Sequence, residues 1–428
     1  MSTTVDTVVV GAGQAGLATS RLLTQGGRDH VVLERGRIGE RWRSERWDSL
    51  RLLTPNWMLS LPGSRYGGPD PDGFAPAATF LEMLEEYAAG FAAPVVEGTA
   101  VEEVCVSGRG PSRYTVTTDA GTWHTRHLVV ASGPHGAPVI PAALGSADLG
   151  PAALLTVRDY RSPSQVAPGS VLVVGASASG VQIAEELQRA GRQVTLAVGR
   201  HTRIPRQYRG FDIYWWLEAT GRLALGLEDV RDREAARRDP SVQLIGRHHS
   251  ARSASEVDLA ALQRLGVRLA GRLVDVTGGV ARFDDGLATR VRETDAAMHR
   301  LLDRLDLYAE RVGLALEIWP PERPSPVPLP PQPPEKLDLG AESISTVVVA
   351  AGHRAHHPWL RLPILRSDGA IRQDDGVTAA PGVYTVGQRF QHSSASGMIC
   401  GARSDAESVV DRIFGADATP FLSPETAA

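Results

Sequence analysis

The chain has 428 residues, of which 42% are hydrophobic and 22% are charged, and its formal net charge is −4. This balance is typical of a globular protein, and a chain of this length can hold two domains, one inserted into the other. No basic excess predicts a nucleic-acid partner, and no apolar run reaches the ~18 residues that a membrane-spanning helix needs. The sequence starts directly with a strand pattern, so we expect a cytoplasmic protein without a nucleic-acid or membrane partner.

The positions of the cysteines and histidines argue against a disulfide-reductase centre and against a metal site. Cys105 and Cys400 lie far apart, and neither is part of a Cys-x-x-Cys pair, which argues against a disulfide-reductase centre. The histidines at 248–249 lie in an arginine-rich stretch, and those at 353–357 share a short loop with a proline. Neither group has the spacing of metal ligands, so we expect no metal site.

The first strong motif is a glycine-rich turn between a strand pattern and a helix pattern. The apolar residues 8–10 are followed by Gly11, Gly13 and Gly16 in the spacing Gly-x-Gly-x-x-Gly. In this motif the first glycine permits a tight turn, the second lets a pyrophosphate approach the backbone, and the third lets the helix pack on the strand. A glycine-rich turn without a ligand is the alternative.

A second apolar run, at residues 30–33, leads to the acid that completes the motif. It ends at Glu34, 18 residues after Gly16, where a carboxylate can hydrogen-bond the hydroxyls of a ribose. Strand, helix and acid together predict a dinucleotide site within residues 5–34. The residues expected to contact this dinucleotide are Gly11, Gly13, Gln14, Ala15, Gly16, Glu34 and Arg35.

The segment that follows, residues 39–57, is dense in arginine and tryptophan. Guanidinium groups clamp phosphates and indoles stack on rings, so we expect Arg41 and Trp42 beside the cofactor. Simple packing against the protein surface is the alternative for any one of these residues. Farther on, the apolar spacing of residues 79–91 predicts a helix.

Short strand patterns then occur at residues 101–106, 114–118 and 122–124. They lead to an apolar run at 128–130, which is typical of a buried parallel strand. The run ends in the small turn of Ser132 and Gly133, which we also expect in the first dinucleotide site.

A second phosphate loop follows the apolar run at 171–174. Gly175, Ser177 and Gly180 take the three glycine positions, and serine is small enough for the middle one and can itself donate to a phosphate. A helical pattern follows the loop, as the motif requires. We expect Gly175, Ser177, Ser179 and Gly180 to contact a second dinucleotide.

The strand after the second loop ends at Arg200 where an NAD-binding protein would carry an acid. An arginine at this place favours the 2′-phosphate of NADP over a bare ribose. Arg203, Arg206 and Arg209 follow closely, and they share this role unless they belong to a solvated basic loop.

The middle of the chain carries an aromatic stretch and a long insertion. Residues 211–217 are the most aromatic of the sequence and fit a substrate path, an interface or a helix that packs between domains. The spacing of residues 287–316 predicts an amphipathic helix, and the proline-rich residues 320–334 then run extended. Together they predict an insertion at about 285–338.

The chain returns to strand patterns near its end. Residues 346–352 end at Gly352 and repeat the earlier pattern of a buried strand with a small-residue turn. A further buried strand closes on Gly387, and a helical pattern follows it. This helix is expected to start near Ser396 and Gly397 and to aim its dipole at an electron-rich ring.

Paired nucleotide loops, two strand-end turns and the final strand together resemble the two-dinucleotide flavoproteins. The order of the loops resembles the class B flavin monooxygenases, and within them the flavin-containing and plant indole-pyruvate monooxygenases with their bacterial relatives. The resemblance covers almost the whole chain except residues 285–338. It implies an α/β fold with two Rossmann-like domains, an FAD domain at 1–165 and 340–428 and an NADPH domain inserted at 166–339.

The same resemblance implies an NADPH- and O2-dependent FAD monooxygenase that acts through a flavin C4a-(hydro)peroxide. Its substrate would be small, and aromatic or a secondary metabolite. The cofactor supplies the hard chemistry, so we expect no acid–base pair, and His392 is the catalytic candidate beside the expected flavin-facing helix. The partners are then the substrate and O2, and the family allows a homodimer.

Two positions depart from the family pattern. Its linking motif, Phe-x-Gly-x-x-x-His, matches residues 150–156, where all three named residues are absent and Thr156 replaces the histidine. The family's active-site asparagine falls at Leu53, with Asn56 nearby as a candidate. These departures leave two alternatives, an FAD-dependent dehydrogenase or oxidase without oxygen insertion, and a non-catalytic flavin- and NADPH-binding protein that docks through its proline-rich segment.

Overall fold

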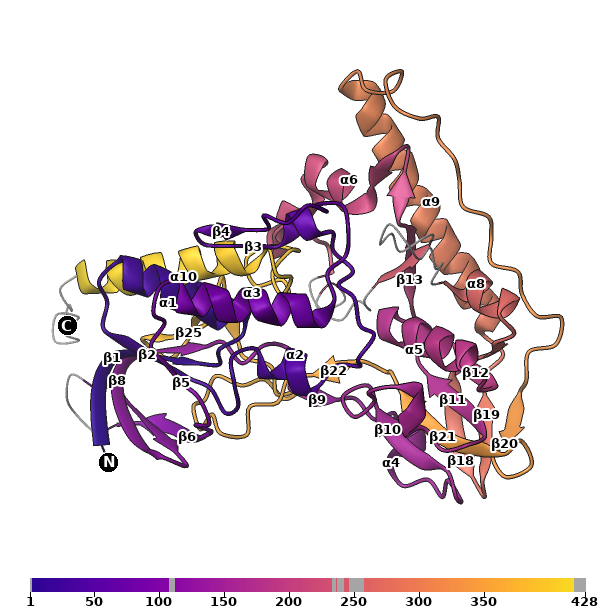
Figure 1. The fold of residues 1–428 in the computed structure, drawn as a ribbon, viewed down its shortest axis with the longest axis horizontal. Helices are drawn as coiled ribbons and strands as arrows, with labels where there is room; N and C mark the ends of the chain where they lie inside the picture. The colour runs from indigo at the N-terminus through magenta and orange to yellow at the C-terminus, as the bar shows by residue number, and fades with distance from the viewer. Residues whose placement is uncertain (1, 108–111, 233–235, 237–241, 246–257, 419–428) are drawn as a thin grey trace, which may run out of the picture.

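The computed structural model describes residues 2–107, 112–232, 236, 242–245 and 258–418. They form two lobes, each built on a largely parallel sheet, with a long helix rising from the second lobe (Figure 1). Within this part of the chain no helix is both long and apolar enough to cross a membrane. The α/β fold with two Rossmann-like domains is confirmed.

The larger sheet has nine strands among the described residues, in the order β23-β24-β25-β8-β1-β2-β5, with β7 and β6 continuing from β8. The central strands β25, β8, β1, β2 and β5 run parallel. The strands of this sheet are β1 (Ser2–Val10), β2 (His30–Leu33), β5 (Val95–Val96), β6 (Val101–Val106), β7 (Tyr114–Thr118), β8 (Gly121–Val130), β23 (Gln373–Asp374), β24 (Val377–Thr378) and β25 (Val383–Thr385).

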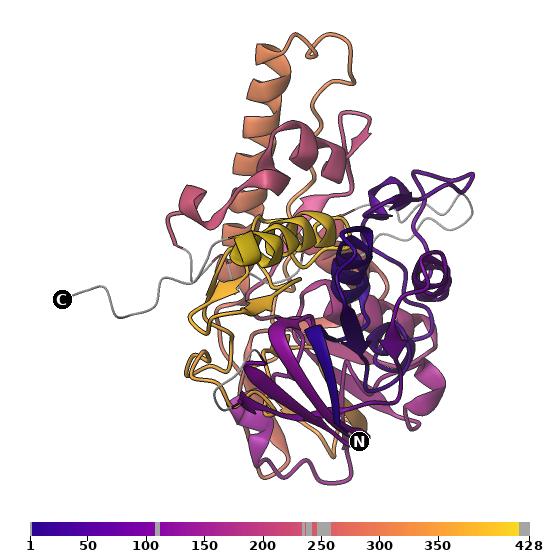
Figure 2. The same ribbon diagram turned by 90° about the vertical axis from the view of Figure 1, so that its left-hand side faces the viewer.

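Side-chain alternation along β1 divides the first lobe into two apolar layers. Val9 faces a core formed with three helices, whereas Val8 and Val10 face the opposite core, because successive side chains of a strand point to opposite faces. Figures 1 and 2 show these helices on one side of the sheet. They are α1 (Gln14–Gln25), α3 (Ala77–Ala89) and α10 (Ala402–Ala418).

The second lobe holds a five-stranded parallel sheet in the order β10-β21-β11-β12-β17, counted over the described residues. A three-stranded antiparallel sheet lies beside it. The elements are β10 (Ala153–Thr156), β11 (Ser170–Val174), β12 (Val194–Ala197), β17 (Arg268–Ala270), β21 (Ile344–Val349), β18 (Leu273–Thr277), β19 (Val280–Phe283), β20 (Lys336–Asp338), α4 (Ala142–Gly145), α5 (Ala178–Arg189) and α8 (Leu259–Arg264).

A helical extension rises from this lobe around Trp216, whose side chain is fully buried. The apolar face of α9 packs on it through Met298, Leu302 and Leu305. The elements of the extension are β13 (Thr202–Pro205), β14 (Gln207–Tyr208), β15 (Phe211–Asp212), α6 (Ile213–Ala219), η3 (Arg222–Ala224), η4 (Leu227–Asp229), β16 (Val242–Ile245) and α9 (Leu287–Arg311).

The two lobes are joined by crossing chain segments. An antiparallel pair links β9 (Ala137–Pro138), which follows the first sheet, with β22 (His353–Arg354), which follows the second. Figure 1 places this pair between the lobes. The remaining short elements are α2 (Glu40–Ser44), η1 (Asn56–Met58), β3 (Ser60–Leu61), β4 (Ser64–Arg65) and η2 (Pro163–Gln165).

Strand pairing corrects the expected domain boundaries at 165/166 and 339/340. Both β10 and β21 pair in parallel within the second sheet, although the sequence-based boundaries placed them in the FAD domain. The reason is topological, since β21 inserts between β10 and β11 and is the strand that joins β10 to the sheet. The second domain therefore starts by Ala153 and continues through Val349.

Two local expectations also change. The patterns at 122–124 and 128–130 belong to one continuous strand, β8, which pairs with β1 along nearly its whole length. The C-terminal helix begins at Ala402, not near Ser396 and Gly397, which lie in the preceding turns. The start of this helix still borders the cavity through Ala402.

The fold predicts that an added methyl group lowers the stability strongly at one glycine of the first loop and hardly at another. A Cβ on Gly16 would overlap the carbonyl oxygen of Gly11, whereas a Cβ on Gly13 would meet no atom within 4 Å. Gly16→Ala should therefore lower the free energy of unfolding by about 1–3 kcal/mol, as overpacking does. Gly13→Ala, the matched control, should change it by less than about 0.5 kcal/mol. Denaturant unfolding of both variants measures this, and equal losses would contradict the packing described here.

Candidate functional site

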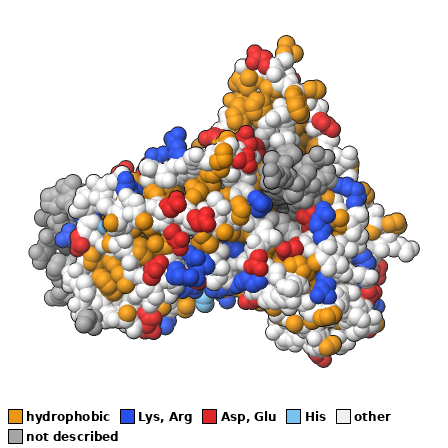
Figure 3. Space-filling model, viewed as in Figure 1, with side chains coloured by type: hydrophobic (Ala, Val, Ile, Leu, Met, Phe, Trp, Pro, Cys, Tyr) orange, Lys and Arg blue, Asp and Glu red, His pale blue; other side chains and the backbone are white. Residues whose placement is uncertain are grey.

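A single cavity of about 2280 Å³ lies between the lobes and reaches both glycine loops. It is lined by Gly11, Gly13 and Gln14 of the first loop and by Gly175 and Ser177 of the second. Its volume exceeds the range of about 300–1,000 Å³ that is usual for one small-molecule pocket. Figure 3 shows this face hollowed between the lobes, with Lys and Arg side chains gathered where they meet.

The first loop has the geometry of a phosphate-binding turn. Gly11 follows β1 at the carboxyl edge of the sheet with φ 110°, and a Cβ there would stand 2.8 Å from the carbonyl oxygen of Ala131. Gly13 caps α1, and the open space beside it lets a ligand approach the backbone. The free N–H groups and the dipole at the start of this helix favour an anion. The loop therefore fits a pyrophosphate.

Glu34 ties this loop to the neighbouring strand. Its carboxylate accepts from the amide of Ala12 at 2.8 Å and from the amide of Gly36 at 3.1 Å. The side chain is largely buried but still borders the cavity. An acid fixed in this way at the end of β2 is placed to meet the ribose of a dinucleotide.

The second loop repeats the backbone of the first. Ser177 caps α5 with φ −81° and ψ −177°, and Gly13 caps α1 with φ −83° and ψ −174°. Gly175 has φ 113°, close to the φ of Gly11, and a Cβ on Gly180 would overlap the carbonyl oxygen of Gly175. The serine is thus accommodated because the middle position needs extended backbone, which any residue adopts. Both loops fit a dinucleotide.

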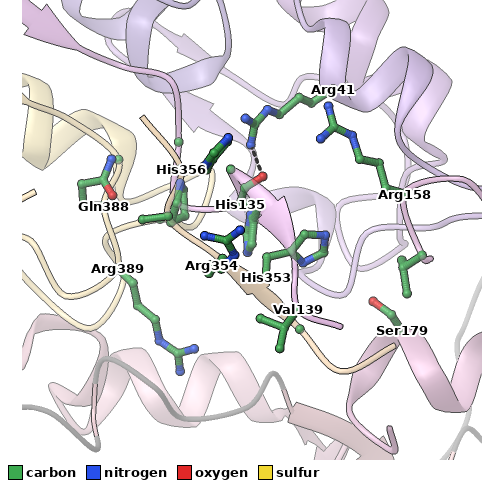
Figure 4. Close-up of a pocket in the computed structure, with 18 of the residues that line it drawn as sticks. Arg41, His135, Val139, Arg158, Ser179, His353, Arg354, His356, Gln388 and Arg389 are labelled. Carbon is green, nitrogen blue, oxygen red and sulfur yellow. Dashed lines mark hydrogen bonds between the residues drawn. The ribbon is translucent and has the colours of Figure 1, made fainter. Parts of the chain in front are cut away.

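A buried carboxylate and several arginines form the wall between the loops. Glu45 accepts from Arg35 at 2.6 Å and from Arg158, and Arg41 lies 4.0 Å away. Arg41 also donates to the carbonyl oxygen of His135 (Figure 4). Three cations share one carboxylate, so this wall keeps a positive excess that suits phosphate groups.

Histidines follow this wall toward the centre of the cavity. Figure 4 shows His135 and His353 between Ser179 on one side and Gln388 and Arg389 on the other. The rings of His135 and His353 lie edge to face with centroids 5.0 Å apart. The His135 side chain is exposed to the cavity and that of His353 is half-buried. Desolvation by the surrounding protein, aided by the other ring and nearby arginines, lowers the pKa of His135 to about 3, and desolvation with nearby arginines lowers that of His353 to about 4. Both rings are therefore neutral at neutral pH, and they can exchange hydrogen bonds without adding charge.

Most of the predicted cofactor residues border this one cavity, although their contact with a cofactor stays a prediction. Gly16 and Gly180 lie behind the loops and serve packing instead. The predicted residues that line the cavity are Gly11, Gly13, Gln14, Ala15, Glu34, Arg35, Arg41, Trp42, Ser132, Gly133, Gly175, Ser177, Ser179, Arg200, Gly352 and Gly387.

Arg206 is a correction, because it is buried away from the cavity lining. Its guanidinium pairs with Asp212 at 3.1 Å, donates to the carbonyl oxygen of Leu53 and lies 3.6 Å from the centre of the Phe74 ring. Burial lowers its pKa to about 10, so it remains charged at neutral pH. The neighbouring arginines that were expected to share its role are equally occupied, Arg203 with Asp258 and Asp295 and Arg209 with Asp306.

The two catalytic candidates also lie outside the lining of the cavity. Asn56 is buried, donates to the carbonyl oxygen of Asp70 and accepts from the amide of Ala75 at 2.8 Å, so its amide group holds a loop together. His392 is half exposed and pairs with Asp375 at 2.7 Å on the surface. Neither side chain is placed to touch a reacting group.

The sequence reasoning missed several residues of this site. His135 and His353 carry no spacing that marks them, although each follows a predicted strand-end turn within three residues. Glu45 and Arg158 lie more than a hundred residues apart and meet only through the fold. Tyr214 was noted only as part of an aromatic stretch, yet it lines the cavity.

The buried position of Arg206 predicts a stability defect, not a cofactor defect. Arg206→Ala leaves Asp212 partly buried without its partner, so the free energy of unfolding should fall by about 3–5 kcal/mol. The affinity of the folded protein for NADPH should stay unchanged. Thermal unfolding together with an NADPH titration measures both effects, and an intact melting temperature with weakened NADPH binding would restore the original expectation.

Comparison with known proteins agrees with this geometry. Residues 8–214 match the pyridine nucleotide-disulphide oxidoreductase family. An uncharacterized CzcO-like oxidoreductase of Geobacillus kaustophilus is 29% identical over 96% of this chain and 98% of its own length. The rice indole-3-pyruvate monooxygenase YUCCA4 is 24% identical over 95% of this chain and 87% of its own length.

The solved structures extend the likeness to the fold of the whole chain. The flavin-containing monooxygenase from Stenotrophomonas maltophilia matches with a TM-score of 0.65 and 18% identity, over 97% of this chain and 99% of that one. At this identity the match shows the fold alone. The chain is therefore similar to the pyridine nucleotide-disulphide oxidoreductases over residues 8–214 and to the indole-3-pyruvate monooxygenases in sequence, and it shares its fold with a flavin-containing monooxygenase.

Proposed function

We propose that the protein is an NADPH- and O2-dependent FAD monooxygenase that oxygenates a small substrate, aromatic or a secondary metabolite. The observation that carries the proposal is the single cavity that joins both dinucleotide loops. Two cofactors bound at its two ends meet in its middle, which hydride transfer between them requires.

Both cysteines are free, which supports a cytoplasmic location. The expected homodimer stays a prediction.

The chain's residues divide the work of binding in this proposal. The first loop and Glu34 would hold FAD, and the second loop and Arg200 would hold NADPH. When bound and reduced, the flavin supplies the chemistry toward O2. The protein positions the two cofactors, and its neutral histidines add no charge beside them.

One observation favours a second candidate, an FAD-dependent oxidase or dehydrogenase without oxygen insertion. Thr156, in place of the linking motif's histidine, donates to Asp159 at 2.6 Å and is not part of the cavity lining, although Val157 and Arg158 are. Because its hydroxyl is hydrogen-bonded within this turn, Thr156 does not reach a cofactor. The family's linkage between NADPH and oxygen chemistry therefore has to come from other residues in this chain.

Isotope labelling separates the two functions. The purified protein with FAD is given NADPH, ¹⁸O2 and a panel of small aromatic compounds, and both products and H2O2 are measured. We expect one atom of ¹⁸O in an oxidised product for each NADPH consumed. Stoichiometric H2O2 without labelled product across the panel would support the oxidase instead, and a protein that takes up no FAD would contradict both.

The position of Arg200 predicts which nicotinamide the protein prefers. Arg200 is exposed and lines the cavity next to the end of β12, where the 2′-phosphate of NADPH would lie. Arg200→Ala should weaken NADPH binding about tenfold, the value of a charge-assisted hydrogen bond, and leave NADH binding nearly unchanged.

The anaerobic reduction rate of the flavin at varied NADPH and NADH measures this effect. Arg282→Ala is the matched control, because that arginine lies in the same domain, pairs with Asp275 where both side chains are exposed, and does not line the cavity. If Arg200→Ala weakened the binding of NADPH and NADH equally, the assignment of Arg200 to the 2′-phosphate would be wrong.

A further inference from the structure

The cavity has a third wall that neither dinucleotide loop accounts for. It comes from three parts of the chain, the loop at 50–54, the helices α6 and η3, and the segment 394–398. Its side chains are mostly apolar, and among its polar members Arg51, Ser394 and Ser396 are hydrogen-bonded within the protein. Those that the argument uses are Leu53, Tyr214, Leu217, Leu223 and Met398.

Helix α6 holds its part of this wall in a fixed place. Asp212 caps the helix by accepting from the amide of Tyr214 at 2.8 Å. Trp216 on the opposite face is fully buried and donates through its indole N–H to the carbonyl oxygen of Tyr208 at 2.8 Å. One face of α6 is thus anchored in the apolar cluster, and Tyr214 and Leu217 border the cavity.

Hydrogen bonds join this helix region to the other two parts of the wall. The hydroxyl of Ser394 donates to the carbonyl oxygen of Arg222 at 2.6 Å, and the amide of Ala395 donates to that of Leu223 at 3.1 Å. Arg206 joins α6 to the loop at 50–54, since it binds both Asp212 and the carbonyl oxygen of Leu53. The wall is therefore built from both domains, and hydrogen bonds hold its parts together.

The hydroxyl of Tyr214 is a polar group on this wall whose role the fold leaves unexplained. Across the part of the chain that the structure describes, this hydroxyl makes no hydrogen bond, although Tyr214 is half-buried and lines the cavity. Burial raises its pKa to about 12, so it stays protonated at working pH and can donate. The hydroxyl is open to the cavity and not enclosed by the protein, so a molecule bound there can accept a hydrogen bond from it.

The charges around this wall restrict what that molecule can be. The acidic residues that line the cavity, Glu34, Glu40, Asp284 and Asp368, come from other parts of the chain. Asp212 is close, but its carboxylate is paired with Arg206. A cationic amine would therefore lose its hydration here without gaining an ion pair, next to a buried guanidinium.

We propose that this third wall is the substrate site, that it takes an uncharged apolar compound bearing a hydrogen-bond acceptor such as a carbonyl, and that the Tyr214 hydroxyl donates to that acceptor and orients it. The inference rests on the proposed function and deepens it, because it names the substrate class. Leu53, Leu217, Leu223 and Met398 would enclose the apolar body of the substrate. A site built to hydrogen-bond one group discriminates strongly against analogues that lack it.

Three probes with one carbon skeleton test the proposal, namely acetophenone, ethylbenzene and 1-phenylethylamine. Their dissociation constants are measured by equilibrium dialysis against the FAD-loaded protein at neutral pH, where the amine is protonated. We expect acetophenone to bind about tenfold more tightly than ethylbenzene, and the amine to bind most weakly. In Tyr214→Phe the affinity for acetophenone should fall to that for ethylbenzene, and the affinity for ethylbenzene should not change.

Two further variants keep the test specific. Tyr308→Phe is the matched control, because Tyr308 packs on the same apolar cluster but does not line the cavity, and it should leave all three affinities unchanged. Leu217→Trp should weaken the binding of both neutral probes, because the larger side chain fills the space beside the wall. Melting temperatures confirm that Tyr214→Phe is folded, which we expect because its hydroxyl bonds no described residue.

The possible results separate this inference from the proposed function. Acetophenone and ethylbenzene binding equally to the unmodified protein, or Tyr214→Phe weakening both equally, would overturn the role of the hydroxyl. Tightest binding of the amine would overturn the substrate class. A protein that binds the probes as expected but transfers no labelled oxygen to any compound would contradict the proposed function alone.

Discussion

Everything in this molecule depends on how closely each glycine loop approaches the end of a neighbouring strand. Gly11 lies against the carbonyl oxygen of Ala131 after β8, and Gly175 lies against that of Ala350 after β21. A side chain at either place would push the loop off the sheet. These two contacts put both helix N-termini at the carboxyl edges of their sheets, and the lobes are arranged so that the two edges face one cavity.

The cavity between the lobes is held by bonds that cross between domains. Arg206 links the extension to the loop at 50–54, the β9–β22 pair crosses between the lobes, and Ser394 and Ala395 hold η3 beside the first domain. Buried ion pairs such as Arg206 with Asp212 gain little net stability, but they fix geometry, because losing one partner is costly. The third wall of the cavity is therefore part of the fold.

The sequence predicted the two dinucleotide units well, because their signals are local. A strand, three small residues and a helix lie within about twenty residues, and backbone geometry alone decides which residue types fit each loop position. Ser177 illustrates this point, since its extended backbone matches that of Gly13. The resemblance to two-dinucleotide flavoproteins followed from the pairing of such units.

What the sequence did not predict depends on contacts between distant segments. The domain boundaries were wrong because β21 inserts between β10 and β11 after an excursion of nearly two hundred residues. Arg200 and Arg206 look alike in sequence, yet one lines the cavity and the other is buried with Asp212. His392 and Asn56 were chosen by proximity to expected elements, and only their hydrogen bonds reveal that they hold loops.

The central claim is that FAD and NADPH meet in the one cavity that joins the two loops. Anaerobic reduction of the FAD-loaded protein by NADPH, with deuterium in turn at each of the two hydrogens of nicotinamide C4, tests it most directly. Direct hydride transfer predicts that one NADPH bleaches one flavin, and that deuterium at only one of the two positions slows the reduction by a primary isotope effect. A flavin that NADPH does not reduce, or one that is reduced at a rate insensitive to both substitutions under conditions where transfer limits the rate, would contradict the account.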